Sequence, residues 1–143
     1  MTSSVWQLNA PVTPTLASGK WSVAGSAGTG LEIFVLRPTA ATTAVPSWPT
    51  MDSDVKSGAR LDVSSTGHTR YLTVLGAKGR VLTATGSDSG GSTIATLTFA
   101  GGATGTVSFS TDGAGGHVTL NGGGVAVDAD LAAGVAKIPV FAP

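Results

Sequence analysis

Cysteine is absent from this chain of 143 residues, and charged residues make up only 11% of it. Without cysteine there can be no disulfide, no thiolate zinc site and no cysteine nucleophile, an absence that fits an oxidising compartment. Eight Lys and Arg balance eight Asp and Glu, so the formal net charge is zero. Because such a chain has no global field to hold a polyanion, we expect no nucleic-acid partner.

Long hydrophobic runs are also missing. No stretch approaches the roughly 18 apolar residues of a membrane span, so we expect no membrane partner. The first four residues, MTSS, lack the basic and apolar regions of a secretory signal peptide. We therefore expect a soluble chain, a mature or excised piece of a secreted or periplasmic bacterial protein.

Glycine and short alternating patterns dominate what is present. The chain has 21 glycines and 41% hydrophobic residues, which is too apolar for a disordered chain and too rich in glycine for a helical one. Apolar residues recur with period two in about eleven short runs, separated by turn-forming residues. This pattern predicts an all-β fold, a single antiparallel two-sheet β-sandwich over residues 1–143 with little or no helix.

Two segments depart from simple alternation. Residues 31–36 are apolar on both sides, which predicts a central strand with both faces covered. Residues 37–58 contain three prolines and no alternation, which predicts a long Pro-rich loop, because proline cannot pair within a sheet. Such a loop either has a function or lies over a sheet edge, and Trp48 and Met51 are its candidate anchors.

One short motif suggests catalysis. Residues 88–91, DSGG, resemble the nucleophile turn of chymotrypsin-type serine proteases. The only histidine before it, His68, lies 21 residues before Ser89, too close for the intervening barrel, and two of the three groups of a triad are missing. We interpret the motif as a glycine hairpin between strands at 81–85 and 93–99.

Metal sites are weakly indicated. Asp112, Asp128 and Asp130 offer the oxygen ligands that calcium prefers, but their spacing fits no EF-hand loop. Aspartates at strand ends commonly form turns with their own backbone, and we favour that interpretation while leaving calcium binding open. His68 and His117 lack a third zinc ligand. We therefore assign no metal ligand. We also predict no cofactor, since the glycines are followed by strands and form no phosphate loop.

An acidic sugar is the ligand that the residues favour most. Sugar-binding sandwiches use exposed aromatic rings as platforms, and Arg or Lys bind carboxylate or sulfate groups. Trp6 and Trp21 alternate in step with core residues and are predicted to be buried. The predicted binding residues are His68, Arg70, Tyr71, Lys78, Arg80 and Trp48. The alternative is that the basic residues only protect a hairpin edge from pairing.

Three phrases in the first half resemble one family. They are VWQLNAPVTPTLASGKWSVAG, LEIFVLRP and TRYLTVLGA, which together follow the order seen in the C-terminal β-sandwich region of heparinase II/III-like polysaccharide lyases. The matching residues are Trp6, Gln7, Leu8, Pro11, Pro14, Leu36, Arg37, Pro38, Tyr71, Leu72, Val74 and Leu75. The resemblance covers most of residues 4–80, and the glycine-rich remainder matches only in general character.

The resemblance implies part of an enzyme. In these lyases an α-helical toroid precedes antiparallel sandwiches, and an acidic polysaccharide is cleaved by β-elimination in the cleft between them. No such toroid is predicted here, and the family's catalytic Tyr and His do not align with His68, Tyr71 or His117. We therefore expect an accessory sandwich that is non-catalytic alone, supports a catalytic α-helical domain and contacts acidic polysaccharide weakly.

Three other functions stay open. An independent carbohydrate-binding or adhesin domain would need an exposed row of aromatic rings. A structural module of a phage fibre or secreted assembly is equally compatible with low charge, abundant Thr and Gly, and many strands. A stand-alone enzyme would need a cleft in which a His, a Tyr and an Arg converge on one point.

Overall fold

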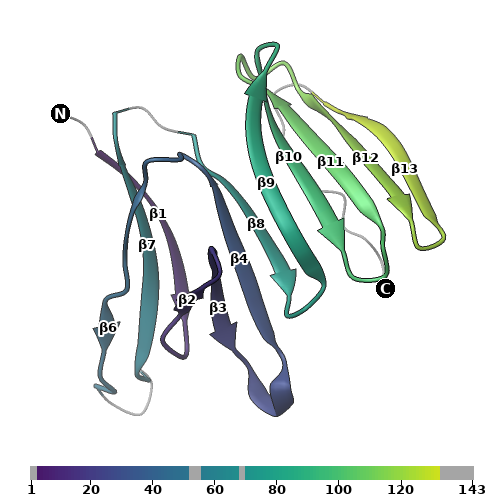
Figure 1. Cartoon of the computed structure of the whole chain (residues 1–143). Helices are drawn as coiled ribbons and strands as arrows, with labels where there is room; N and C mark the ends of the chain where they lie inside the picture. Colours follow the sequence, from purple (N-terminus) through teal and green to yellow (C-terminus); the bar gives the residue numbers. More distant parts are fainter. Residues whose placement is uncertain (1–2, 52–55, 68–69, 133–143) are drawn as a thin grey trace. The chain divides into compact units, whose positions relative to one another are not determined.

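A computed structural model describes residues 3–51, 56–67 and 70–132. The chain is all-β, as its alternation predicts (Figure 1). Thirteen strands occur in the described ranges: β1 (Ser3–Ala10), β2 (Thr15–Ala17), β3 (Lys20–Ala24), β4 (Gly30–Arg37), β5 (Thr42–Ala44), β6 (Ser47–Trp48), β7 (Gly58–Thr66), β8 (Leu72–Ala77), β9 (Val81–Ser89), β10 (Ser92–Phe99), β11 (Thr104–Ser110), β12 (Gly116–Gly122) and β13 (Val125–Leu131). The one helical turn among them is the 3-10 helix η1 (Ser26–Gly28). This part of the chain contains no helix that is long and apolar enough to cross a membrane.

Three short strands, β2, β5 and β6, were not predicted. Residues 37–58, expected to be a long loop, contain β5 and β6, and both pair with β7. Trp48 anchors this segment, since its Nε1 donates to the Lys56 carbonyl at 2.9 Å. Met51 does not, because it is 73% exposed. The eleventh expected strand, at 138–140, lies outside the described residues.

Contacts group the chain into two compact units, Met1–Val81 and Leu82–Pro143. The first unit holds two antiparallel four-stranded sheets, one ordered β1-β7-β5 with β6 also on β7, the other ordered β2-β3-β4-β8. The second holds one five-stranded sheet. The predicted all-β, antiparallel, sandwich-like fold is confirmed, with three sheets in the described residues where two were predicted. A single domain over 1–143 stays a prediction.

The core of the first unit lies between its two sheets. Ile33, Leu61 and Val63 are fully buried there. Leu61 and Val63 alternate along β7 with the outward-facing Arg60 and Asp62, so period two places every second side chain inside. The half-buried residues packed against this cluster are Trp6, Leu8, Trp21, Val23, Leu31, Val35, Ala41, Val45 and Tyr71. Trp6 and Trp21 were predicted to point toward the core, and their packing against it agrees with that prediction.

The predicted central strand is confirmed as β4. It lies between β3 and β8 in its sheet. Consecutive residues of a strand point to opposite faces, and Ile33 is 0% and Phe34 7% exposed. Both faces of β4 are therefore covered, as the apolar residues on both of its sides predict.

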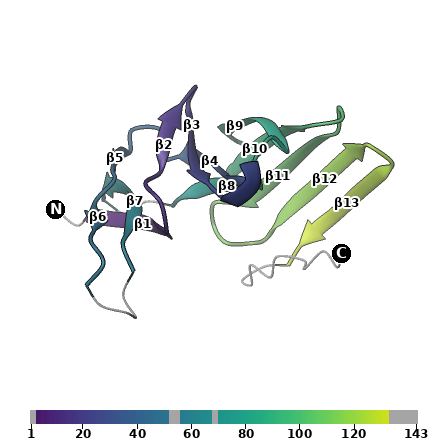
Figure 2. The same cartoon turned by 90° about the horizontal axis from the view of Figure 1, so that it is seen from below.

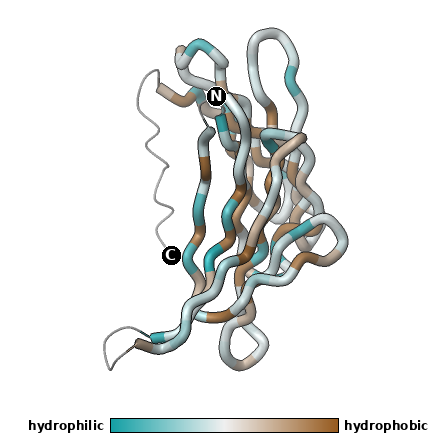
Figure 3. Tube along the Cα trace, turned by 90° about the vertical axis from the view of Figure 1, so that its left-hand side faces the viewer, coloured by the Kyte–Doolittle hydropathy of each residue, from teal (hydrophilic) through white to brown (hydrophobic). Residues whose placement is uncertain are grey.

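The second unit is a meander in which β9 to β13 lie side by side in chain order (Figure 2). The hairpin predicted around the DSGG motif is confirmed: β9 ends at Ser89, β10 begins at Ser92, and Gly90 and Gly91 between them have positive φ. Hydrophobic and hydrophilic residues alternate in the sequence of these strands, as they do along the first-unit strands nearest the viewer in Figure 3. The alternation separates an apolar face from a polar one.

Strand register defines the two faces of this sheet. On one face, Val107 of β11 pairs with Val118 of β12. On the other, the hydroxyls of Thr106 and Thr119 lie 2.7 Å apart. The polar face also carries His117, which stands opposite Asp130 of β13.

Candidate functional site

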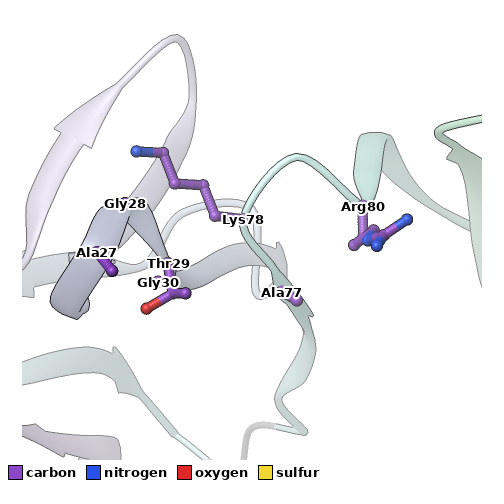
Figure 4. A pocket seen from close by; sticks show the side chains of 7 residues that line it. All are labelled: Ala27, Gly28, Thr29, Gly30, Ala77, Lys78 and Arg80. Atoms are coloured by element: carbon purple, nitrogen blue, oxygen red, sulfur yellow. The ribbon is translucent and has the colours of Figure 1, made fainter.

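A shallow hollow in the first unit contains two of the predicted binding residues, Lys78 and Arg80 (Figure 4). Both are exposed and flank Gly79 in the turn that follows β8. The other lining residues are Ala27, Gly28, Thr29, Gly30 and Ala77. The hollow thus has small or backbone walls and two cations.

Backbone pairing explains why these segments meet. Leu31 of β4 pairs with Ala77 of β8, so the start of β4 lies beside the end of β8. The Lys78 amide then donates to the Gly30 carbonyl at 2.9 Å. The loop that precedes β4 is closed by Thr29, whose Oγ1 donates to the Ser26 carbonyl at 2.6 Å. Sheet register therefore brings the η1 loop and the cationic turn together.

A buried carboxylate supports the same turn. The side chain of Glu32 is 7% exposed, and its Oε1 lies 2.7 Å from Lys20 Nζ. Its Oε2 accepts the Gly79 amide at 3.1 Å. The hydrogen bond from Lys20 lowers the pKa of Glu32, against the opposing effect of burial. Sequence reasoning missed this residue, although a lone carboxylate inside the apolar run GLEIFVLR was the available signal.

Glu32→Gln is expected to destabilise the first unit by about 1–3 kcal/mol, because the amide cannot form the charged contact with Lys20. A lowered pKa means that the carboxylate's contribution is present above pH 4.5, its ordinary value, and is lost as pH falls through the lowered one. Urea unfolding at pH 7 and at acidic pH measures both effects. Asp62→Asn is the comparison, since Asp62 forms an ion pair with Arg60 on the side of β7 away from the core, with 15% of its side chain exposed. An equal loss in both variants would contradict a special role for Glu32.

The two cations of the hollow do not converge. Figure 4 shows Lys78 and Arg80 extending in different directions from the turn. They therefore cannot bind one small anion between them in this arrangement. Two separated charges are better suited to successive acidic groups along an extended ligand.

Tyr71 is held inside the first unit. Its hydroxyl donates to the Ser4 carbonyl at 2.6 Å and lies 3.1 Å from Ser4 Oγ. Its ring packs against the buried cluster of Ile33, Leu61 and Val63. The phenol thus ties β1 to the start of β8 and offers no stacking platform.

The remaining predicted residues lie elsewhere. Arg70 is exposed and precedes β8, whereas Lys78 follows it. The six residues of β8 span about 20 Å, so Arg70 is not brought to the hollow. Trp48 is half-buried, and its ring lies against Gly58. A Cβ added to Gly58 would lie 2.6 Å from Cζ2 of the Trp48 ring. His68 lies outside the described residues.

A second polar cluster occurs in the second unit. His117 Nε2 lies 3.0 Å from Asp128 Oδ1, and its Nδ1 lies 2.8 Å from Asp130 Oδ1. These contacts raise the pKa of His117, the hydrogen bond to Asp130 contributing most. Counting outward from the turn at Gly123 and Gly124 places His117 opposite Asp130, so this pairing could have been found from the sequence.

The three aspartates considered for calcium are not gathered. Asp112 accepts the Ala114 amide at 2.8 Å and a hydrogen bond from Ser110, in the turn between β11 and β12. This confirms the turn interpretation for Asp112. Asp128 and Asp130 contact His117 instead. In the described ranges, no group of three or more His, Asp or Glu side chains is placed to hold a metal ion.

Comparison of the chain with protein-family models, curated proteins and solved structures finds no match. Its function therefore has to be argued from its own residues.

Proposed function

We propose that this chain is an accessory β-sandwich region, similar to those that follow the catalytic domain of heparinase II/III-like polysaccharide lyases. In this role it supports a catalytic α-helical domain, is non-catalytic alone and makes weak ionic contacts with an acidic polysaccharide. The observation that carries the proposal is the exposed pair Lys78 and Arg80 on the hollow beside η1. The resemblance of residues 4–80 to that family supplies the class of ligand.

The packing and hydrogen bonding of the aromatic side chains favour this role over an independent carbohydrate-binding domain. Trp6, Trp21 and Tyr71 pack against the core of the first unit. The indole N–H of Trp48 is occupied by the Lys56 carbonyl. Stacking a sugar requires an exposed ring face, so ionic contact is the more suitable mode for this surface.

The chemistry of the two cations suits uronate or sulfate groups. A guanidinium binds such groups in a planar fork, and an ammonium binds them as a point charge. Because both side chains are exposed, each contact is screened by salt and individually modest. The expected binding is therefore weak and strongest at low ionic strength.

Binding to heparin, alginate and hyaluronan at low salt tests the ionic contact. Lys78→Ala combined with Arg80→Ala is expected to weaken binding about two- to tenfold, as the loss of two exposed ion pairs predicts. Lys56→Ala is the control, because it removes an exposed cation that does not line the hollow. An unchanged affinity in the double variant would contradict this site, and no binding at low salt would leave only the supporting role.

The supporting role has its own test. The full-length precursor should encode an α-helical toroid before this sandwich. Joining the two parts should raise the thermal stability of the helical part relative to the helical part alone. A precursor without a helical domain would contradict the accessory role and favour a structural module.

A further inference from the structure

His117 stands between two carboxylates of the outermost strand of the second unit. β13 forms one edge of the five-stranded sheet. Asp130 is the cross-strand partner of His117, and Asp128 is the partner of Thr119 two residues along β12. Each carboxylate therefore reaches a different ring nitrogen, at 3.0 Å for Asp128 and 2.8 Å for Asp130.

This arrangement requires a doubly protonated ring. A neutral imidazole has one N–H and one lone pair, whereas an ionised carboxylate can only accept. With neutral His117, one carboxylate would face a lone pair at hydrogen-bond distance. Only the imidazolium can donate to both Asp128 and Asp130.

No other cation shares this sheet. Residues 81–131 contain no Lys or Arg but four aspartates, Asp88, Asp112, Asp128 and Asp130. On the side of β11, the residue opposite His117 is the neutral Ser108, whose hydroxyl donates to the His117 carbonyl at 3.4 Å. The charge state of this histidine therefore decides whether charged side chains of β13 and β12 attract each other.

We propose that His117, Asp128 and Asp130 form a proton-dependent latch that holds the edge strand β13 on β12 in acid and loosens it as pH rises. The contacts with Asp130 and Asp128 raise the pKa of His117 above its ordinary 6.5. A raised pKa means that the latch is complete below pH 6.5 and is lost as pH increases through the higher, folded-state value.

Because the latch lies on the edge strand β13, its effect is expected in the local opening of that strand. The side chains of Asp128 and Asp130 are 82% and 92% exposed, so each contact is modest. Most residues of β13 are exposed as well, with Val127 and Leu131 half-buried. Edge strands with little burial open at low free-energy cost. A modest contact therefore shifts the opening of β13 without unfolding the rest of the sheet.

Amide hydrogen exchange on the intact chain tests the latch. Protection factors, each referred to the unstructured rate at the same pH, are measured for β13 and for the interior strand β11 at pH 5.5 and 8.5. We expect the protection of β13 to fall about two- to fivefold on going to the higher pH, as the loss of an exposed ion pair predicts. Protection of β11 should stay constant. NMR titration of the His117 ring should give a pKa above 6.5.

Three variants make the result specific. His117→Gln should abolish the pH dependence of β13 protection, and Asp128→Asn with Asp130→Asn should lower the pKa of His117. Asp88→Asn is the matched control, because β10 and β11 separate β9 from β12, a distance of about 14 Å that exceeds the Debye length. A His117 pKa at or below 6.5, or a pH dependence that persists in His117→Gln, would overturn the proposal.

Discussion

Leu61→Ala is expected to lower the free energy of unfolding of the first unit by about 2–5 kcal/mol. Leu61 is 0% exposed and lies on β7 in contact with the other fully buried side chains, Ile33 and Val63. Its truncation removes buried methyl groups and leaves a cavity between two sheets. Both sheets are held by their own hydrogen-bond ladders, so they cannot collapse fully into that space.

Urea unfolding followed by tryptophan fluorescence measures this loss. Trp6, Trp21 and Trp48 are the chain's three tryptophans, and all lie in the first unit, so the signal reports that unit. Leu16→Ala is the control, because Leu16 is 57% exposed on β2 and should change stability by less than about 0.5 kcal/mol. Similar losses of unfolding free energy in Leu61→Ala and Leu16→Ala would contradict the position of Leu61 in the core.

Gly116→Ala is expected to destabilise the second unit by about 3 kcal/mol, the upper end of what overpacking usually costs. A Cβ on Gly116 would lie 2.0 Å from the Ser108 carbonyl oxygen. This oxygen belongs to the neighbouring strand β11, so relief requires the two backbones to move apart. The pairing of Phe109 with Gly116, the last of the β11–β12 ladder, would be lost first.

Far-UV circular dichroism during thermal unfolding measures the effect, and the tryptophan signal shows whether the first unit is also affected. Gly113→Ala is the control in the preceding turn. A Cβ at Gly113 meets nothing within 4 Å, but the backbone has φ of +84°. Strain of that kind costs about 1 kcal/mol. A loss in Gly116→Ala no larger than that in Gly113→Ala would contradict the predicted crowding between β11 and β12.

Much of the fold follows from the sequence. Period-two alternation identifies β4 and β7, because a strand that buries one or both faces must carry apolar residues at matching intervals. Glycine pairs identify the tight turns, such as Gly90-Gly91 with positive φ, since few other residues adopt that conformation. The short strands β2, β5 and β6 escaped prediction, because two or three residues are too few to show a period and prolines surround them.

The candidate sites, like the fold, could be predicted from the sequence only in part. The exposure of Lys78 and Arg80 follows from their place in a glycine turn. The role of Tyr71 does not, since its hydroxyl bonds Ser4, a residue 67 positions away. Glu32 reads as an anomaly within an apolar strand, but its partners Lys20 and Gly79 come from two other parts of the chain.

The sequence by itself determined the all-β class, the turns and which side of each long strand is apolar, because these depend on neighbours within a few residues. Only the tertiary structure decided that GHTRYLTVLG places Tyr71 against the core, that the η1 loop meets the cationic turn, and that Asp128 and Asp130 reach the two nitrogens of His117. Those outcomes depend on strand order and register. Both are set by pairing and burial across the whole sheet rather than by any local pattern.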